Sequence, residues 1–161
     1  MGTHRPLLAR GAWCLLVAIL GGLLGASTSA LAKSSVAIPI SGTVDGSPEG
    51  VSVSGLAHIK SSLVKIDRKF HHAPRVNLAF DLHNVSGTGL STGARYVGRS
   101  RDEVIRPLVA SDVVEITFPL QPKGTSGSTA ARAGLASFTL SFDVNTGVLT
   151  GGTATVSTPG S

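Results

Sequence analysis

Apolar and polar residues alternate along most of the chain beyond residue 32, and helical spacing is almost absent. A period of two places successive side chains on opposite faces of a strand, one dry and one wet. Residues 76–83 and 136–144 show this alternation most clearly. Both segments are therefore predicted to be half-buried strands.

Two further segments alternate less regularly. Residues 114–120 include Pro119, which indicates an edge strand or a bulge because proline cannot donate to a ladder. Residues 51–66 alternate with a change of phase at Ser61 and Ser62, which predicts a bulge at that point.

Glycine-rich sequences separate these runs, at residues 45–50, 86–89, 123–128 and 145–147. Glycine supplies the positive φ that tight turns need. Several short strands joined by such turns are typical of all-β domains. We therefore expect a single antiparallel β-sandwich, with a small β-barrel as the alternative.

The segment "SRDEVIRP", residues 100–107, does not follow the alternation. Ser100 and Glu103 have the spacing of a helix capping box, and Pro107 would end any helix within two turns. A charged loop that joins two sheets fits the same residues at least as well.

The simplest hairpin joins residues 51–66 to residues 75–85, with Ile66 opposite Arg75. Residues that lie opposite each other in a ladder share a face of the sheet. This register buries four apolar residues: Ile59, Leu63, Leu78 and Leu82. On the outer face it sets Lys60 beside Asp81, and His58 beside His83.

Three of the four histidines beyond residue 32 lie in the stretch "FHHAPRVNLAFDLH", residues 70–83. Imidazole and carboxylate groups suit zinc or copper, so His58, Asp81 and His83 are the candidate metal ligands. His71 and His72 belong to the loop at the far end of the hairpin and would not join them. We therefore expect solvated strand residues, with no bound metal and no other cofactor.

Residues 1–32 follow the order of a secretory signal peptide, with basic residues first, an apolar run at 12–26 and small residues that end in "ALA". Cleavage after Ala32 would leave residues 33–161 as a single domain in a bacterial periplasm or outside the cell. The apolar run is shorter than the roughly 20 residues that span a bilayer, so we expect no membrane span in the mature chain. The only cysteine, Cys14, leaves with this leader, so the domain has no disulfide.

Loss of the leader removes Arg5 and Arg10 and lowers the net charge from +5 to +3. This excess permits weak attraction to an anionic surface but does not favour nucleic acid, and the few dispersed aromatic residues offer no stacking platform for bases. Four arginines lie within twelve residues and could hold phosphate or carboxylate groups of a polysaccharide or lipid head group. These candidate ligand-binding residues are Arg95, Arg99, Arg101 and Arg106. A solvated charged loop is the alternative, since Asp102 and Glu103 offset half of the charge.

No catalytic signature is present. Serines are abundant, but no strained "GxSxG" turn holds one as a nucleophile, and "SGTG" near residue 87 lacks the strand-to-helix setting of a phosphate-binding loop. We therefore expect a protein that is not an enzyme.

Two segments carry resemblances to known families. The end of the chain, "LSFDVNTGVLTGGTATVS", resembles the terminal hairpin of bacterial immunoglobulin-like surface domains, which share a D-x-x-T-G-x-L-x-G turn. The segment "STGARYVGRSRDEVIRPLVASDVVEITF" resembles the T-G…R-D…I-T-F run of the lipocalin-like YceI family, whose periplasmic barrels hold long isoprenoid tails. The aromatic run that this family places after R-D is missing here. The first resemblance implies a sandwich, and the second implies a ligand-binding barrel.

These observations favour an exported, non-enzymatic β-domain with a binding or surface-structural role. The alternative is a periplasmic lipocalin-like carrier of a small lipophilic ligand, in which inward-facing residues surround a cavity. Those residues would include Phe80, Leu82, Phe118, Phe138 and Phe142. The expected partner is therefore an anionic surface or a small lipophile.

Overall fold

The computed structural model describes residues 33–64, 73–124 and 130–160, and every regular element in these ranges is a β-strand. The proposed signal peptide, His71, His72 and most of the 123–128 turn lie outside the described residues. The eight strands are β1 (Lys33–Val44), β2 (Val51–Leu63), β3 (Arg75–Gly89), β4 (Arg95–Gly98), β5 (Arg101–Pro107), β6 (Ser111–Pro122), β7 (Arg132–Asp143) and β8 (Val148–Ser157).

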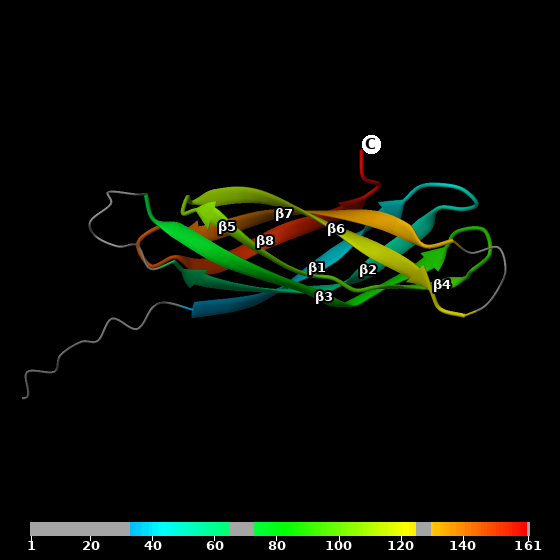
Figure 1. Ribbon diagram of the computed structural model, residues 1–161, viewed down its shortest axis with the longest axis horizontal. Helices are drawn as coiled ribbons and strands as arrows, with labels where there is room; N and C mark the ends of the chain where they lie inside the picture. Colours follow the sequence, from blue (N-terminus) through cyan, green and yellow to red (C-terminus); the bar gives the residue numbers. More distant parts are fainter. Residues whose placement is uncertain (1–32, 65–72, 125–129, 161) are drawn as a thin grey trace, which may run out of the picture.

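Seven of the strands close into a barrel, in the order β1, β2, β3, β4, β6, β7, β8 and back to β1 (Figure 1). All neighbours are antiparallel except β1 and β8, which meet in parallel where Gly42 lies beside Val156. A Cβ atom on Gly42 would lie 1.9 Å from the backbone oxygen of Val156, so only glycine allows this approach. This closed ring of strands supports the small barrel and not the sandwich. The sequence could not decide between them, because the alternation of apolar and polar residues looks the same in both folds and closure depends on contacts distant in sequence.

The strand β5 is an addition to the barrel. The fifteen residues of β3 pair with β4 near the end of β3 and with β5 near its start, on the same side. Among the described residues, no ladder joins β5 to the first part of β6. The expectation of a helix or a loop at residues 100–107 is therefore wrong. Pairing of Arg101–Pro107 with Arg75–Asp81 satisfies more backbone groups than a helix of two turns could.

The interior of the barrel is filled by side chains. Inward-facing residues of all seven barrel strands are buried, and the rings of Phe80 and Phe138 pack with centroids 5.1 Å apart. The five residues expected to face inward, Phe80, Leu82, Phe118, Phe138 and Phe142, are each at most 6% exposed. A barrel of this few strands has an interior just wide enough for its own side chains.

The pairing of β2 with β3 is confirmed, but its predicted register is wrong. Asp81 lies opposite His58 rather than Lys60, and Lys60 lies opposite Ala79. Two shifts add up to this difference: Leu56 already lies opposite Asn84 rather than Val85, and a bulge in which Leu82 and His83 together face Ala57 adds a second residue. The predicted bulge at Ser61 and Ser62 is absent from the ladder.

The burial of the hairpin follows from this register. Ile59, Leu78 and Leu82 are buried as expected, whereas Leu63 is half-buried. Ser61 stays on the inner face, where its hydroxyl hydrogen-bonds that of Ser34 at 2.7 Å.

Two of the predicted turns are confirmed and one is wrong. Residues 45–50 connect β1 to β2, and residues 145–147 lie in the turn between β7 and β8. Residues 86–89 instead belong to β3, and the turn follows at residues 90–94. Pro119 lies on β6 just before the β4 ladder begins at Leu120, so on that side it belongs to an unpaired edge.

Candidate functional site

The four candidate arginines follow one line along β4 and β5, and the structure divides them into two pairs. Arg101 lies 3.4 Å from a carboxylate oxygen of Asp81, and Arg106 lies 2.7 Å from Asp112. Hydrogen bonds from Arg106 lower the pKa of the Asp112 carboxyl and raise the pKa of Arg106 itself. These two arginines are therefore matched by acids of the same chain.

Arg95 and Arg99 remain without such a partner. Both are exposed, and neither forms an ion pair with any residue in the described part of the chain. The backbone N–H of Lys123, at the end of β6, donates to the carbonyl of Arg95 at 2.7 Å. The chain thus brings a third cation beside Arg95, from a segment that the sequence reasoning did not connect with it.

We call this region of β4 and β6 the basic surface, formed by Arg95, Arg99 and Lys123. It contains two adjoining hollows of about 340 and 270 Å³, which share Val97 and Lys123. No acidic residue lines either hollow, and the lining also contains three hydroxyl or amide side chains, Ser86, Thr88 and Gln121. The remaining lining residues are Gly87, Tyr96, Val97, Pro119 and Pro122. Cations and neutral hydrogen-bonding groups together suit an anionic ligand that also carries hydroxyls.

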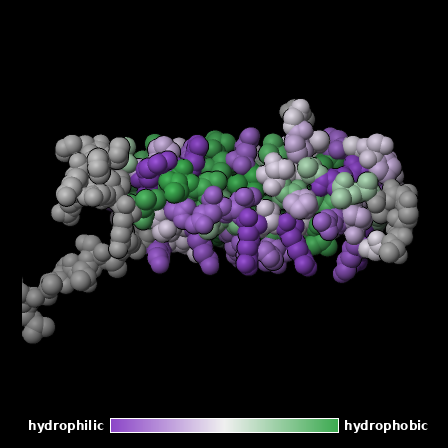
Figure 2. Space-filling view, viewed as in Figure 1, coloured by the Kyte–Doolittle hydropathy of each residue, from purple (hydrophilic) through white to green (hydrophobic). Residues whose placement is uncertain are grey.

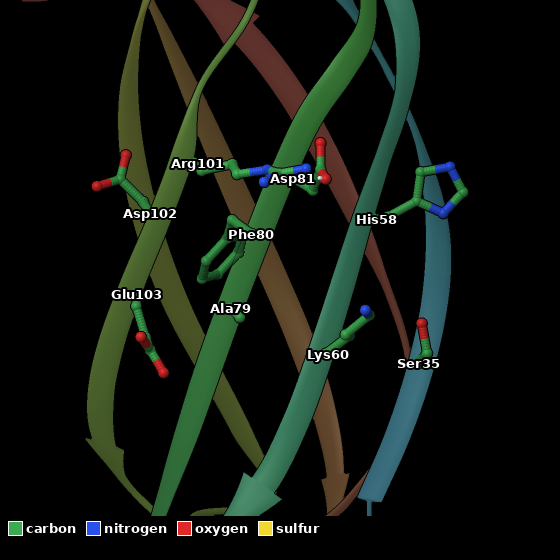
Figure 3. Close-up of a pocket in the computed structure, with 9 residues that line it drawn as sticks. All are labelled: Ser35, His58, Lys60, Ala79, Phe80, Asp81, Arg101, Asp102 and Glu103. Atoms are coloured by element: carbon green, nitrogen blue, oxygen red, sulfur yellow. Dashed lines mark ion pairs between the residues drawn. The ribbon is translucent and has the colours of Figure 1, made fainter.

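A third hollow, of about 660 Å³, lies on the outer side of β1, β2, β3 and β5. We call it the mixed-charge groove, and Figure 3 shows its lining side chains. It is lined by Ser35, His58, Lys60, Ala79, Phe80, Asp81, Arg101, Asp102 and Glu103. Bases and acids are interleaved across neighbouring strands, so this groove has no net preference for one sign of charge.

Asp81 is the most heavily engaged residue of the mixed-charge groove. Its carboxylate accepts a hydrogen bond from the backbone N–H of His83 at 3.0 Å, contacts the His83 ring, and faces Arg101. Desolvation opposes ionisation of this carboxyl, but the contacts with His83 and Arg101 outweigh it and lower its pKa below the ordinary value. The bulge at Leu82 and His83 creates this arrangement, because it presents the His83 side chain beside Asp81.

The three candidate metal ligands do not converge. His58 lies opposite Asp81 in the ladder, but Figure 3 shows its ring directed away from that carboxylate. The cation of Arg101 occupies the space on the other side of Asp81. Within the described ranges, no three residues among histidine, cysteine, aspartate and glutamate are grouped so as to hold a metal ion.

Sequence reasoning missed Glu49, a buried acid at the end of the barrel that carries the turn at residues 45–50. Glu49 is only 5% exposed, and it accepts hydrogen bonds from Thr92, Ser91 and Tyr96. The hydroxyl and backbone N–H of Thr92 are the main causes of a lowered pKa for this carboxyl. Glu49 therefore ties the β1–β2 turn to the β3–β4 turn. The only signal in the sequence was an acid between glycine-rich residues, which is common in exposed turns.

No protein-family model, curated protein or solved structure matches the chain. In the part that the structure describes, no helix is long and apolar enough to cross a membrane. The barrel is compatible with a lipocalin-like binding domain.

Proposed function

We propose that this chain is an exported, non-enzymatic binding domain whose basic surface holds an anionic polysaccharide. The observation that carries the proposal is the grouping of Arg95, Arg99 and Lys123 around two hollows without an acid. The neighbouring Arg101 and Arg106 are matched by Asp81 and Asp112, so among the four candidate arginines the unmatched charge lies on Arg95 and Arg99, where Lys123 adds to it.

The groups around these cations favour a polysaccharide over a membrane surface. Ser86, Thr88 and Gln121 can exchange hydrogen bonds with sugar hydroxyls, whereas membrane-binding surfaces combine cations with exposed apolar side chains. One large apolar residue, Leu90, is exposed in the turn between β3 and β4. Three others are exposed along β5, its connection to β6 and the start of β6: Ile105, Val109 and Val113. They lie toward the other end of β6, where Figure 2 shows apolar residues on the half of the molecule in which β5 and β6 separate.

Spacing supports a ligand with repeated negative groups. Arg95 and Arg99 are four residues apart in extended chain, which places their Cα atoms about 13 Å apart. A single small anion would reach one of them, and a polymer with regularly placed carboxylates or sulfates could reach both.

Binding to immobilised polygalacturonate and dextran sulfate tests this proposal. A triple variant with Arg95→Gln, Arg99→Gln and Lys123→Gln should lose at least tenfold in affinity, and wild-type binding should weaken steeply as salt is raised. The matched control carries Lys33→Gln, Lys60→Gln and Arg75→Gln, which removes the same charge elsewhere and should keep most of the affinity. Equal losses of affinity in the two triple variants would show that net charge alone causes the binding, and would overturn the assignment of the site. Tighter binding to phosphatidylglycerol vesicles than to either polymer would make a membrane the target.

The alternative function is a carrier that holds a small lipophile inside the barrel. The closed seven-strand barrel supports it, but the inward residues pack against one another, as Phe80 and Phe138 do. A ligand in the interior would have to displace them, and the open basic surface requires no such rearrangement. We therefore favour binding on the outer surface.

Export rests on the leader-like order of residues 1–32. Intact-mass measurement of the protein recovered from a bacterial periplasm should give a chain that starts at Lys33. A dominant species that retains Trp13 would contradict the export proposal.

A further inference from the structure

Arg132 is the first residue of β7, and its position in the alternation is that of the inward-facing Gly134 and Ala136. It lies opposite Leu120, at the end of the barrel that also carries Glu49. Its guanidinium reaches beneath the β1–β2 turn, where a Cβ atom on Gly46 would lie 2.6 Å from Nη1. Gly46 has a φ of 147°, so both the space and the backbone conformation at this position require glycine.

Two donors of this guanidinium are buried without any hydrogen-bond partner, Nε and Nη2 of Arg132. Buried polar groups in folded proteins are almost always paired, and an unpaired buried charge is among the most costly arrangements known. An orphaned guanidinium edge therefore indicates a group that completes it.

The acids nearest in sequence to the turn above Arg132 are directed elsewhere. Both carboxylate oxygens of Glu49 accept hydrogen bonds from the segment that contains Ser91, Thr92 and Tyr96. Asp45 forms no ion pair with Arg132, and its Oδ1 lies 3.6 Å from a Cβ built on Gly50. The turn thus contains two carboxylates, and neither of them forms an ion pair with Arg132.

We propose that the Nε and Nη2 edge of Arg132 binds a small oxyanion, a carboxylate or a phosphate, at this end of the barrel. The two donors form the side of the guanidinium that accepts a carboxylate through two parallel hydrogen bonds. Arg106 uses the same two atoms to hold both oxygens of Asp112, at 2.7 and 2.9 Å. Arg132 presents the same edge, and its ligand comes from outside the chain.

This site is separate from the basic surface and does not depend on the proposed function. Arg95, Arg99 and Lys123 are exposed, whereas the Arg132 edge is enclosed. The enclosure selects for size, because a polymer cannot reach Nε and Nη2, so the ligand has to be an anion of a few atoms. A carboxylate and a phosphate both present two oxygens bound to one atom. Acetate and inorganic phosphate, tested separately, show which of these two classes of anion binds.

Thermal unfolding of the whole protein in acetate, in phosphate and in chloride at matched ionic strength tests the site. The Tm of the wild type should rise as acetate or phosphate is added, and the anion that gives the larger rise identifies the source. The variant Arg132→Met should show no anion-specific rise. In chloride its Tm should equal or exceed that of the wild type, since it buries no unpaired charge. The control Arg99→Met should keep the wild-type response.

NMR of the arginine Nε–Hε groups provides a readout that needs no variant to fold. The signal of Arg132 should shift and saturate as the anion is titrated. In the thermal-unfolding titration, the variant Arg132→Lys, which keeps the charge but loses the planar fork, should lose at least tenfold in affinity. An Arg132 signal that does not move would overturn the proposal. The same conclusion would follow if the wild type and Arg132→Met gained equal Tm in phosphate, because water or another neutral group would then complete the edge.

Discussion

Arg106 holds both carboxylate oxygens of Asp112 from Nε and Nη2, and so joins β5 to β6 where no backbone ladder does. Asp112 is the more buried partner, with 14% of its side chain exposed against 42% for Arg106. The pair therefore fastens the added strand β5 to the start of β6.

Replacing Arg106 by Met should destabilise the protein more than replacing both Arg106 and Asp112 by apolar residues. The single change leaves the largely buried Asp112 carboxylate without its ion-pair partner, whereas the double change removes that unpaired negative charge as well. We expect the single variant to lower Tm by about 3 °C. Arg101→Met is the control, since that arginine is exposed. Additive effects of Arg106→Met and Asp112→Val would show that the two side chains do not interact.

Glu49→Gln should weaken the protein at neutral pH and flatten its loss of stability in acid. The hydrogen bonds from Thr92, Ser91 and Tyr96 hold the pKa of Glu49 below the ordinary 4.5, so the unfolded chain takes up its proton first. This contribution is complete above pH 4.5 and is lost as the pH falls through the lower folded value. Tm measured between pH 7 and pH 3 should fall more steeply for the wild type than for the variant over that window. Parallel curves would contradict the assigned role.

Phe138→Ala should remove about 4 kcal/mol from the free energy of unfolding, because Phe138 is fully buried against Phe80 and the barrel cannot collapse around the space. Denaturant unfolding measures the loss, and Phe138→Leu should lose much less. The same pair of proteins tests the carrier alternative. A lipophilic fluorescent probe should bind the cavity variant and not the wild type, and tight binding by the wild type would favour a ligand inside the barrel.

Zinc and copper should leave the Tm of the protein unchanged at neutral pH. His58 turns away from Asp81, whose carboxylate is already engaged by His83 and Arg101. Titration of each metal, alongside a variant with His58→Ala and His83→Ala, decides the point. A rise of several degrees that disappears in the double variant would restore a metal site to this face.

The strands that sequence alone predicted are those in which every second residue is strongly apolar, such as the runs that contain Phe80 and Phe138. Alternation reports which residues of a strand share a face, and this part of the prediction is confirmed for β2, β3, β6 and β7. It does not report how two strands are aligned. The ladder is already one residue out of the predicted register at Leu56, and the extra residue at Leu82 and His83 adds a second, so that Asp81 lies opposite His58 and not Lys60.

The candidate site was predicted in part for a similar reason. Arginines clustered in sequence are easily seen, but their free or neutralised state depends on which acids lie across from them. Asp81 reaches Arg101 only through the β3–β5 ladder, and Lys123 joins Arg95 only through the β4–β6 contact. Glu49 became buried because Thr92, more than forty residues later, closes over it.

The strand β5 exposes a row of backbone donors and acceptors that no described strand of this chain uses on that side, and such a row can template the addition of a strand from another molecule. Its sequence opposes that outcome, because Arg101, Asp102 and Glu103 place charges along it and Pro107 closes its end. Exchange of these charges for threonine and valine would leave the barrel intact and remove the barrier to growth of one sheet across many molecules. The barrier to such growth would therefore consist of a few charged side chains on a strand that the barrel does not need for closure.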